Sequence, residues 1–146
     1  MFGAVLDTVG VADLFNGLAN ALTGRTRGGP AKIAVVSSAL MGMVSGETSA
    51  NVATTGVFTI PLMKRVGYPP HFAGAVECAA SAGGQILPPV MGATAFVMAD
   101  TLGIPYMTLA MAALLPAILY FLGVFCTVHF RAVRLGLSGL SEEETP

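Results

Sequence analysis

Residues 31–65 read AKIAVVSSALMGMVSGETSANVATTGVFTIPLMKR and determine how the rest of the chain is arranged. One straight helix over this apolar stretch would be roughly 50 Å long, far beyond the roughly 30 Å hydrocarbon core of a bilayer. Its middle, residues 45–51 (SGETSAN), is small and polar and holds a helix poorly in lipid. Each apolar half has about 13 residues, or roughly 20 Å of helix. The pattern predicts a re-entrant helical hairpin whose tip stops inside the membrane.

The composition excludes a soluble protein of ordinary type. The chain has 146 residues, of which 54% are hydrophobic and 10% are charged, whereas soluble domains average about 25% charged residues. A chain this short cannot bury so much apolar surface in its own core, so lipid is expected to cover the excess. A basic patch with interleaved aromatic residues is missing from the sequence, so nucleic acid is not an expected partner.

Two further features of the sequence concern its start and its cysteines. The first ten residues, MFGAVLDTVG, begin within an apolar stretch and lack the charged region and cleavage site of a signal peptide. We therefore expect a truncated start and a fragment of a larger membrane protein. Cys78 and Cys126 lie in apolar stretches without metal-ligand spacing, and both are expected to be small buried hydrophobic residues.

The segment 1–30 is expected to contain a truncated helix end, an amphipathic helix and a basic connector rich in glycine. Apolar residues recur at helical spacing over residues 11–22, with Asp13, Asn16 and Asn20 between them. Such a helix lies either in the membrane interface or against a neighbouring helix, and the sequence leaves both open.

Residues 66–137 are expected to form two transmembrane helices. The first begins at Pro69-Pro70 and is broken at 83–89, GGQILPP, because paired glycines and prolines remove backbone hydrogen bonds at membrane depth. Non-helical backbone at that depth persists only inside protein or beside a water-filled cavity. The second helix runs from Tyr106 to about Phe130, and residues 138–146 form a disordered tail.

The positive charges indicate the orientation. They lie at three connections that this arrangement places on one side: Arg25, Arg27 and Lys32; Lys64 and Arg65; Arg131 and Arg134. The opposite loop, near Asp100, carries none. The positive-inside rule therefore places the hairpin mouth in the cytoplasm of a multi-pass protein of the bacterial inner membrane.

The candidate ion- and substrate-binding residues lie at the two helix breaks. Broken helix ends offer carbonyl groups to cations and N–H groups to anions. A hydroxyl at these positions has an ordinary alternative, a bond to a carbonyl of its own helix. Glu47 either binds a cation or a proton or is simply solvated, and structural pairing is expected for Glu77. The candidates are Ser45, Gly46, Glu47, Thr48, Ser49 and Asn51 at the tip, and Gly83, Gly84, Gln85, Pro88 and Pro89 at the break.

Catalysis is not expected. The tip reads Gly42-Met43-Val44-Ser45-Gly46, one residue too long for the G-x-S-G loop of intramembrane serine proteases. Neither histidine is predicted at membrane depth, and no phosphate loop or nicotinamide fingerprint occurs in the sequence. We therefore expect neither an enzyme nor an organic cofactor.

Two motifs resemble a known family. The segment GGPAKIAVVSSALMGMVSGETSANVATTGVFTIPLMKRVGYPPHFAGAVE and the later SAGGQILPPVMGATAFVMAD resemble the large membrane subunit of tripartite ATP-independent periplasmic (TRAP) transporters, most of all the fused permeases that use TAXI-type binding proteins. The resemblance implies half of an inverted-repeat elevator transporter that imports carboxylates with sodium. The implied partners are a periplasmic substrate-binding protein, a small membrane subunit or its fused equivalent, and a missing second half of the permease.

By the same resemblance, the tip (45–51) and the break (83–89) flank one sodium site, with Ser45, Asn51, Gly83 and Gly84 as candidate ligands. The usual tip reads S-G-S-x-x-A-N, and Glu47 replaces a small polar residue here. That difference leaves sodium or proton coupling open. The alternative function is a channel-like or structural membrane subunit without coupled transport.

Overall fold

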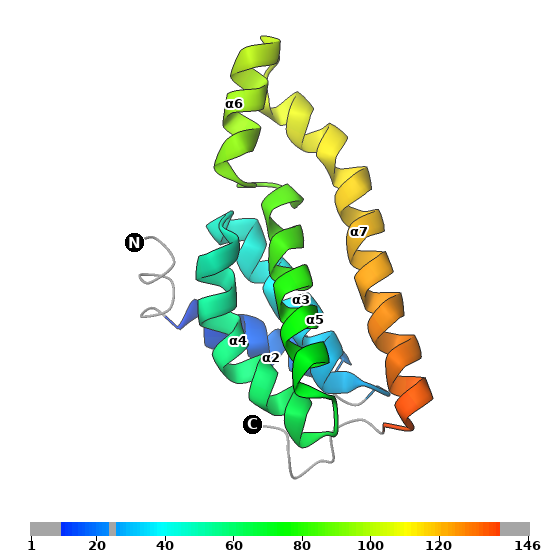
Figure 1. Ribbon diagram of the computed structural model, residues 1–146. Helices are drawn as coiled ribbons and strands as arrows, with labels where there is room; N and C mark the ends of the chain where they lie inside the picture. The colour runs from blue at the N-terminus through cyan, green and yellow to red at the C-terminus, as the bar shows by residue number, and fades with distance from the viewer. Residues whose placement is uncertain (1–9, 24–25, 138–146) are drawn as a thin grey trace.

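The computed structural model describes residues 10–23 and 26–137, and the described part is built of helices without strands (Figure 1). The prediction of an all-α protein is confirmed. The segment 1–9 and the tail 138–146, where the sequence predicts a truncated helix end and disorder, lie outside the described residues. The elements are α2 (Val11–Thr23), α3 (Gly29–Ser45), α4 (Thr48–Arg65), α5 (Pro70–Gly83), the 3-10 helix η1 (Gly84–Ile86), α6 (Ala93–Leu102) and α7 (Tyr106–Leu135).

α3 and α4 form an antiparallel pair joined by two residues, Gly46 and Glu47. Gly46 ends α3 because its φ of +62° places it in the left-handed region that glycine tolerates best. The sequence predicted a longer non-helical tip, residues 45–51, but Ser49 and Asn51 belong to the first turn of α4. The two helices have 17 and 18 residues, or roughly 26 Å each, and are therefore longer than the predicted halves.

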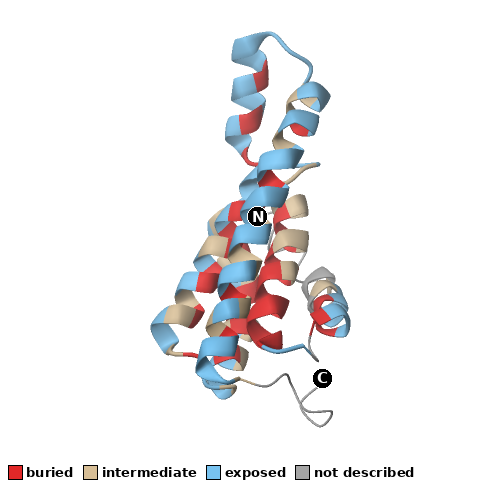
Figure 2. Cartoon of the chain, turned by 90° about the vertical axis from the view of Figure 1, so that its right-hand side faces the viewer, coloured by how far each residue is buried: buried red, intermediate tan, exposed pale blue. Residues whose placement is uncertain are grey.

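α3, α4 and α5 pack into a bundle whose core contains mainly small residues. The core is red in Figure 2, and five of its buried members are Ala31, Ala34, Ala73, Ala80 and Ala132. Large apolar side chains lie on the outside instead, and Leu115 on α7 is 65% exposed. Small residues let helix backbones approach closely, which is how helices pack when the solvent is itself apolar.

The helix that follows the bundle is interrupted. α5 is followed by η1 and then by residues 87–92, which have no regular structure, before α6 begins at Ala93. In Figure 1, α6 projects beyond the bundle, and α7 returns alongside both α6 and α5. The Tyr106 hydroxyl attaches the start of α7 to this interruption, since it lies 3.0 Å from the Pro89 carbonyl oxygen.

α7 is, within the described residues, the one helix long and apolar enough to cross a membrane. Its 30 residues span roughly 45 Å, and Pro116 lies inside it. The helix ends at Leu135 rather than near Phe130, because Gly136, with a φ of +66°, supplies its left-handed cap.

α2 packs against α3, where Ala19 and Ile33 are fully buried. The other side of α2 carries exposed leucines, Leu14, Leu18 and Leu22. α2 therefore contacts a neighbouring helix and also keeps an apolar face that suits the membrane interface. Packing against a neighbouring helix and lying in the membrane interface, the two alternatives left open by the sequence, are thus compatible in one helix.

The ends of several helices meet at the side opposite the hairpin tip. A Cβ added at Gly28 would lie 2.6 Å from both Ala132 Cβ and the Tyr68 hydroxyl oxygen, so the start of α3, the α4–α5 loop and the end of α7 are neighbours. The described cations near these ends are Arg27, Lys32, Lys64, Arg65, Arg131 and Arg134. The charge cluster inferred from the sequence is therefore also a cluster in space.

One expectation about the cysteines is wrong. Cys78 and Cys126 are free and exposed rather than buried. Cys78 is on the outer face of α5 and Cys126 on the outer face of α7, where the sequence places apolar neighbours around them. An apolar stretch identifies lipid-facing and protein-facing positions equally, so it could not indicate which side these thiols take.

Candidate functional site: the hairpin tip and the helix break

The hairpin tip lies beside the interruption between α5 and α6, as Figure 1 shows. A cavity of about 410 Å³ lies between them. Four of the predicted candidates line it, together with residues 90–92 and the start of α6. The lining residues are Ser45, Gly46, Glu47, Gln85, Val90, Met91, Gly92, Ala93, Thr94 and Phe96. The structure thus brings three candidates of the tip and Gln85 of the break to one cavity, while the other candidates lie outside its lining.

Backbone groups join the tip to the break directly. The Val90 N–H donates to the Met43 carbonyl oxygen at 3.3 Å, a carbonyl in the last turn of α3. Gly46 lies against the Met91 carbonyl so closely that a Cβ at position 46 would overlap that oxygen. A glycine is therefore required at Gly46 both by its positive φ and by this contact.

The two paired glycines of the break serve different contacts. Gly84 lies against Gly42 of α3, and a Cβ at Gly84 would lie 2.6 Å from Gly42 Cα. Gly83 faces α7 instead, where an added Cβ would lie 2.6 Å from Tyr120 Cε1. One glycine permits the hairpin to approach and the next permits α7 to approach, so Gly83 lies away from the tip.

Asn51 is fully buried between the hairpin helices. Its Nδ2 donates to the Ser38 carbonyl oxygen at 2.8 Å, and the Thr55 hydroxyl lies 3.4 Å from its Oδ1. An added Cβ at Gly84 would lie 3.3 Å from Nδ2, so Asn51 and Gly84 are neighbours as expected. Ser45 differs, because its Oγ is buried in the cavity wall without a hydrogen-bond partner among the described residues.

Glu47 acts as the N-cap of α4. Its two carboxylate oxygens accept hydrogen bonds from the backbone N–H groups of Ser49 at 3.0 Å and Ala50 at 2.5 Å. These N–H groups have no partner within the helix, and a carboxylate at this position also suits the positive end of the helix dipole. The Glu47 side chain is exposed, and the neighbouring Thr48 and Ser49 lie at or near the surface of the tip.

Three backbone carbonyl groups at the break, those of Gln85, Pro89 and Val90, already accept hydrogen bonds. The Gln85 carbonyl accepts from the Gly92 N–H at 2.7 Å, which closes the loop over residues 85–92. The Pro89 and Val90 carbonyls lie 3.0 and 2.5 Å from the Tyr106 hydroxyl, whose single proton they share. Pro88, joined to Pro89 by a cis peptide bond, is outside the cavity lining.

The comparison with known protein families now identifies the chain. All of residues 1–146 match the family model described as "Tripartite ATP-independent periplasmic transporter, DctM component". The chain belongs to this family. It is therefore a part of a membrane permease, and the predicted resemblance to the large TRAP membrane subunit is confirmed.

Curated relatives support the same family. The chain is 40% identical over 87 residues to the C4-dicarboxylate TRAP transporter large permease protein DctM of Pseudomonas aeruginosa, covering 60% of this chain and 20% of the relative. It is 31% identical over 132 residues to the uncharacterized protein YgiK of Salmonella typhimurium, covering 90% and 30%. It is 32% identical over 87 residues to the isethionate TRAP transporter permease protein DctMQ of Oleidesulfovibrio alaskensis, covering 60% and 14%. This DctM-family chain thus spans less than a third of each of these relatives.

A second polar cluster of the DctM-family chain was not among the predicted site residues. Glu77 is fully buried, and its carboxylate lies within hydrogen-bond distance of hydroxyl groups on three helices: Ser38, Thr55, Thr59 and Ser81. The sequence contained a signal, because Thr55 and Thr59 are four residues apart, as are Glu77 and Ser81, so each pair shares one helix face. The sequence analysis expected structural pairing for Glu77 but did not identify the residues with which it pairs.

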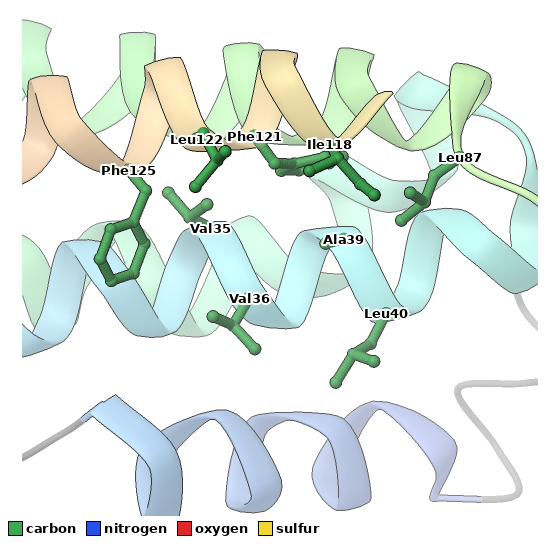
Figure 3. A pocket seen from close by; sticks show the side chains of 9 residues that line it. All are labelled: Val35, Val36, Ala39, Leu40, Leu87, Ile118, Phe121, Leu122 and Phe125. Carbon is green, nitrogen blue, oxygen red and sulfur yellow. The ribbon is translucent and has the colours of Figure 1, made fainter. Parts of the chain in front are cut away.

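An apolar cavity of about 420 Å³ lies between α3 and α7. Figure 3 shows aliphatic and aromatic side chains along its walls, with Phe121 and Phe125 on α7 and Leu87 from the break. All nine lining residues are apolar. Ions and carboxylates need polar partners, so the more polar cavity at the tip is the better candidate for transport.

Proposed function

We propose that this chain forms part of a multi-pass inner-membrane permease that imports small organic acids together with sodium. The observation that supports it best is the cavity between the hairpin tip and the helix break. The two backbones are in direct contact there, at Gly46 with Met91 and at Gly84 with Gly42. Secondary transporters bind substrate and coupling ions at such interruptions, because free helix ends supply carbonyl oxygens and N–H groups near the middle of the membrane. The chain length relative to its relatives implies that the rest of the permease completes the site.

The sodium part of the proposal centres on Ser45. Its unpartnered Oγ supplies an oxygen ligand in the cavity wall, and Gln85, which lines the same cavity, carries an amide oxygen. Asn51 and Gly84 contribute by holding the hairpin against the break, since the Asn51 amide is bonded to Ser38. Gly83 contributes least to an ion, because it contacts Tyr120.

The substrate class and the partners also belong to this proposal. The two named relatives act on C4-dicarboxylate and on isethionate, which are both small organic anions. We propose a carboxylate substrate for this chain from the first of these names, since isethionate is a sulfonate. We also propose a periplasmic substrate-binding protein of the TAXI type and a small membrane subunit, and the name DctMQ of one relative is consistent with a fused form.

Uptake measurements in proteoliposomes test this function. The complete permease, with its binding protein, should accumulate a labelled organic acid only when a sodium gradient is directed inward. Replacing Ser45 with alanine should raise the sodium concentration needed for half-maximal uptake, since one oxygen ligand is lost. Ionic conductance without a binding protein and without sodium dependence would instead favour a channel-like subunit.

The proposed orientation has its own test. Exposed Cys78 and Cys126 are first replaced by alanine, so that a single introduced cysteine reports alone. Cysteine at Lys64 should then react with an impermeant reagent only from the cytoplasm, and cysteine at Thr101 only from the periplasm. Periplasmic labelling at position 64 would show that α3 and α4 do not form a re-entrant hairpin.

A further inference from the structure

Glu77 is an acidic residue buried among hydroxyl groups in the helix bundle. It lies in the middle of α5 and is 0% exposed, and it accepts hydrogen bonds from hydroxyl groups on α3, α4 and α5. The Ser38 Oγ lies 2.9 Å and the Ser81 Oγ 3.2 Å from Oε1. The Thr55 Oγ1 lies 2.5 Å from Oε1, and the Thr59 Oγ1 lies 2.5 Å from Oε2.

The described residues provide no positive charge against this carboxyl group. The ionisable side chains on the helices packed around it have other positions: Lys32 on α3 bonds to Thr26; Lys64 and Arg65 end α4; His71 and Cys78 are exposed on α5; Cys126, His129, Arg131 and Arg134 occupy the last third of α7. Glu47, the other described acid of these helices, caps α4 at the tip. An acidic residue placed inside a membrane protein without a counter-ion is a candidate for ion or proton binding.

The hydroxyl groups around Glu77 can accommodate it with or without a proton. Thr59 has one hydroxyl proton and two acceptors, the Thr55 carbonyl at 3.0 Å and Glu77 Oε2 at 2.5 Å. Thr55 likewise chooses between the Asn51 carbonyl at 2.8 Å and Oε1 at 2.5 Å. Both threonines donate to a carboxylate. A protonated carboxyl donates to Thr59 instead, and Thr59 then donates to its own helix carbonyl.

The change between the two states therefore needs only rotation of hydroxyl hydrogens. A metal ion fits less well, because it would have to enter between oxygen atoms that are already in direct hydrogen-bond contact. Every hydrogen-bonding oxygen around the carboxyl group remains paired in either protonation state, so neither state leaves a buried polar atom without a partner.

We propose that Glu77 and its four hydroxyl partners form a proton-binding site, separate from the cavity at the hairpin tip. The bound species is a proton from water, which forms an O–H bond at Oε2 and is released as the same bond breaks. Because Glu77 is fully buried among α3, α4 and α5, exchange with water requires the hairpin to separate from α5. Proton binding would thereby be linked to the movement of the hairpin.

Infrared difference spectroscopy on the complete permease in lipid tests the site without any transport. We expect a carbonyl stretch of a protonated carboxylic acid that is present at low pH and disappears as the pH is raised. The band should be lost in Glu77→Gln and retained in Asp100→Asn, a matched removal of an exposed acid. Thr59→Val, which keeps the shape and the carboxyl group, should shift the band because one hydrogen bond is lost.

Two results would overturn the proton site. A folded Glu77→Gln variant with the same spectra as the wild type at every pH would mean that this carboxyl group does not exchange its proton. A Glu77-dependent signal that follows sodium at constant pH, and does not respond to pH, would identify a metal-ion site instead. Thr59→Val repeats the measurement if Glu77→Gln does not fold.

A transport measurement tests whether proton binding at Glu77 affects uptake, and this test rests on the proposed function. Glu77→Gln should reduce the pH dependence of uptake several-fold while the sodium concentration for half-maximal uptake stays unchanged. An unaltered pH profile in an active variant would contradict a role in transport. If the wild type itself shows no uptake, the proposed function fails, while the spectroscopic result on Glu77 still stands.

Discussion

Replacing Gly84 with alanine should separate the hairpin from the helix break. The new Cβ would lie 2.6 Å from Gly42 Cα, whereas ordinary contact begins at 3.4 Å, so the two backbones must move apart by about 0.8 Å. The two atoms are a Cβ and a Cα, whose positions the backbone fixes. No change of rotamer can therefore relieve the clash. Overpacking of this kind costs about 1–3 kcal/mol. Gly84 has a φ of −59°, so no backbone strain is added.

A matched control is available on α5, the helix that precedes η1. Gly74 of α5 has no atom within 4 Å of an added Cβ. Gly74→Ala should therefore leave the free energy of unfolding unchanged or raise it by up to about 1 kcal/mol, since alanine is the better helix former. The difference between the two variants isolates the contact with Gly42 from the general effect of adding a methyl group.

The assay combines thermal unfolding of the complete permease in detergent with hydrogen exchange of the backbone. Gly84→Ala should lower the unfolding temperature and speed exchange in η1 and the last turn of α3, while Gly74→Ala should do neither. Adding Gly42→Ala to Gly84→Ala should cost less than the sum, because both methyl groups enter the same contact. If Gly84→Ala unfolds and exchanges like the wild type, the close backbone contact does not exist.

Three further outcomes follow from the tip and the break. Gly46→Ala should abolish uptake, because its Cβ meets the Met91 carbonyl, whereas Gly103→Ala adds similar left-handed strain at a φ of +64° in open space and should keep uptake. Glu47→Ser should retain the helix cap and most of the thermal stability that Glu47→Ala loses, and an equal loss in both would exclude capping as the role of Glu47. Tyr106→Phe should destabilise the permease by about 0.5–1.5 kcal/mol in thermal unfolding, since the hydroxyl that bonds the break is lost, and an unchanged midpoint would contradict that role.

Local chain signals mark several helix ends, although the sequence placed the end of α7 near Phe130 rather than at Leu135. Gly46, Gly103 and Gly136 end α3, α6 and α7 with positive φ, and glycine is the residue that marks such ends in a sequence. Pro70 begins α5 in the same way, because proline fits the first turn of a helix. The length of the tip was overestimated, because a polar run suggests a loop, whereas Glu47 caps α4 and residues 48–51 already belong to that helix.

The detailed contacts between helices could not be predicted from the sequence. Gly83 and Gly84 are adjacent and identical, and only the crossing of α5 with its neighbours decides that one faces α7 and the other α3. The orientation of the Asn51 amide likewise depends on where the Ser38 carbonyl lies across the hairpin. The partners of Glu77 come from three helices, so the periodicity of one helix indicates its buried face but not the residues opposite it.

The alanine core has a consequence for how the chain tolerates substitution. Positions such as Ala80 and Ala132 have no free space beside them, so each added carbon atom must push two helices apart. The bulky residues on the outer faces are exposed among the described residues, so a change in their apolar shape does not push two of these helices apart. A mutational scan should therefore show the reverse of the pattern familiar from water-soluble domains: strict requirements at the smallest residues, and free exchange among leucine, isoleucine and phenylalanine at the largest.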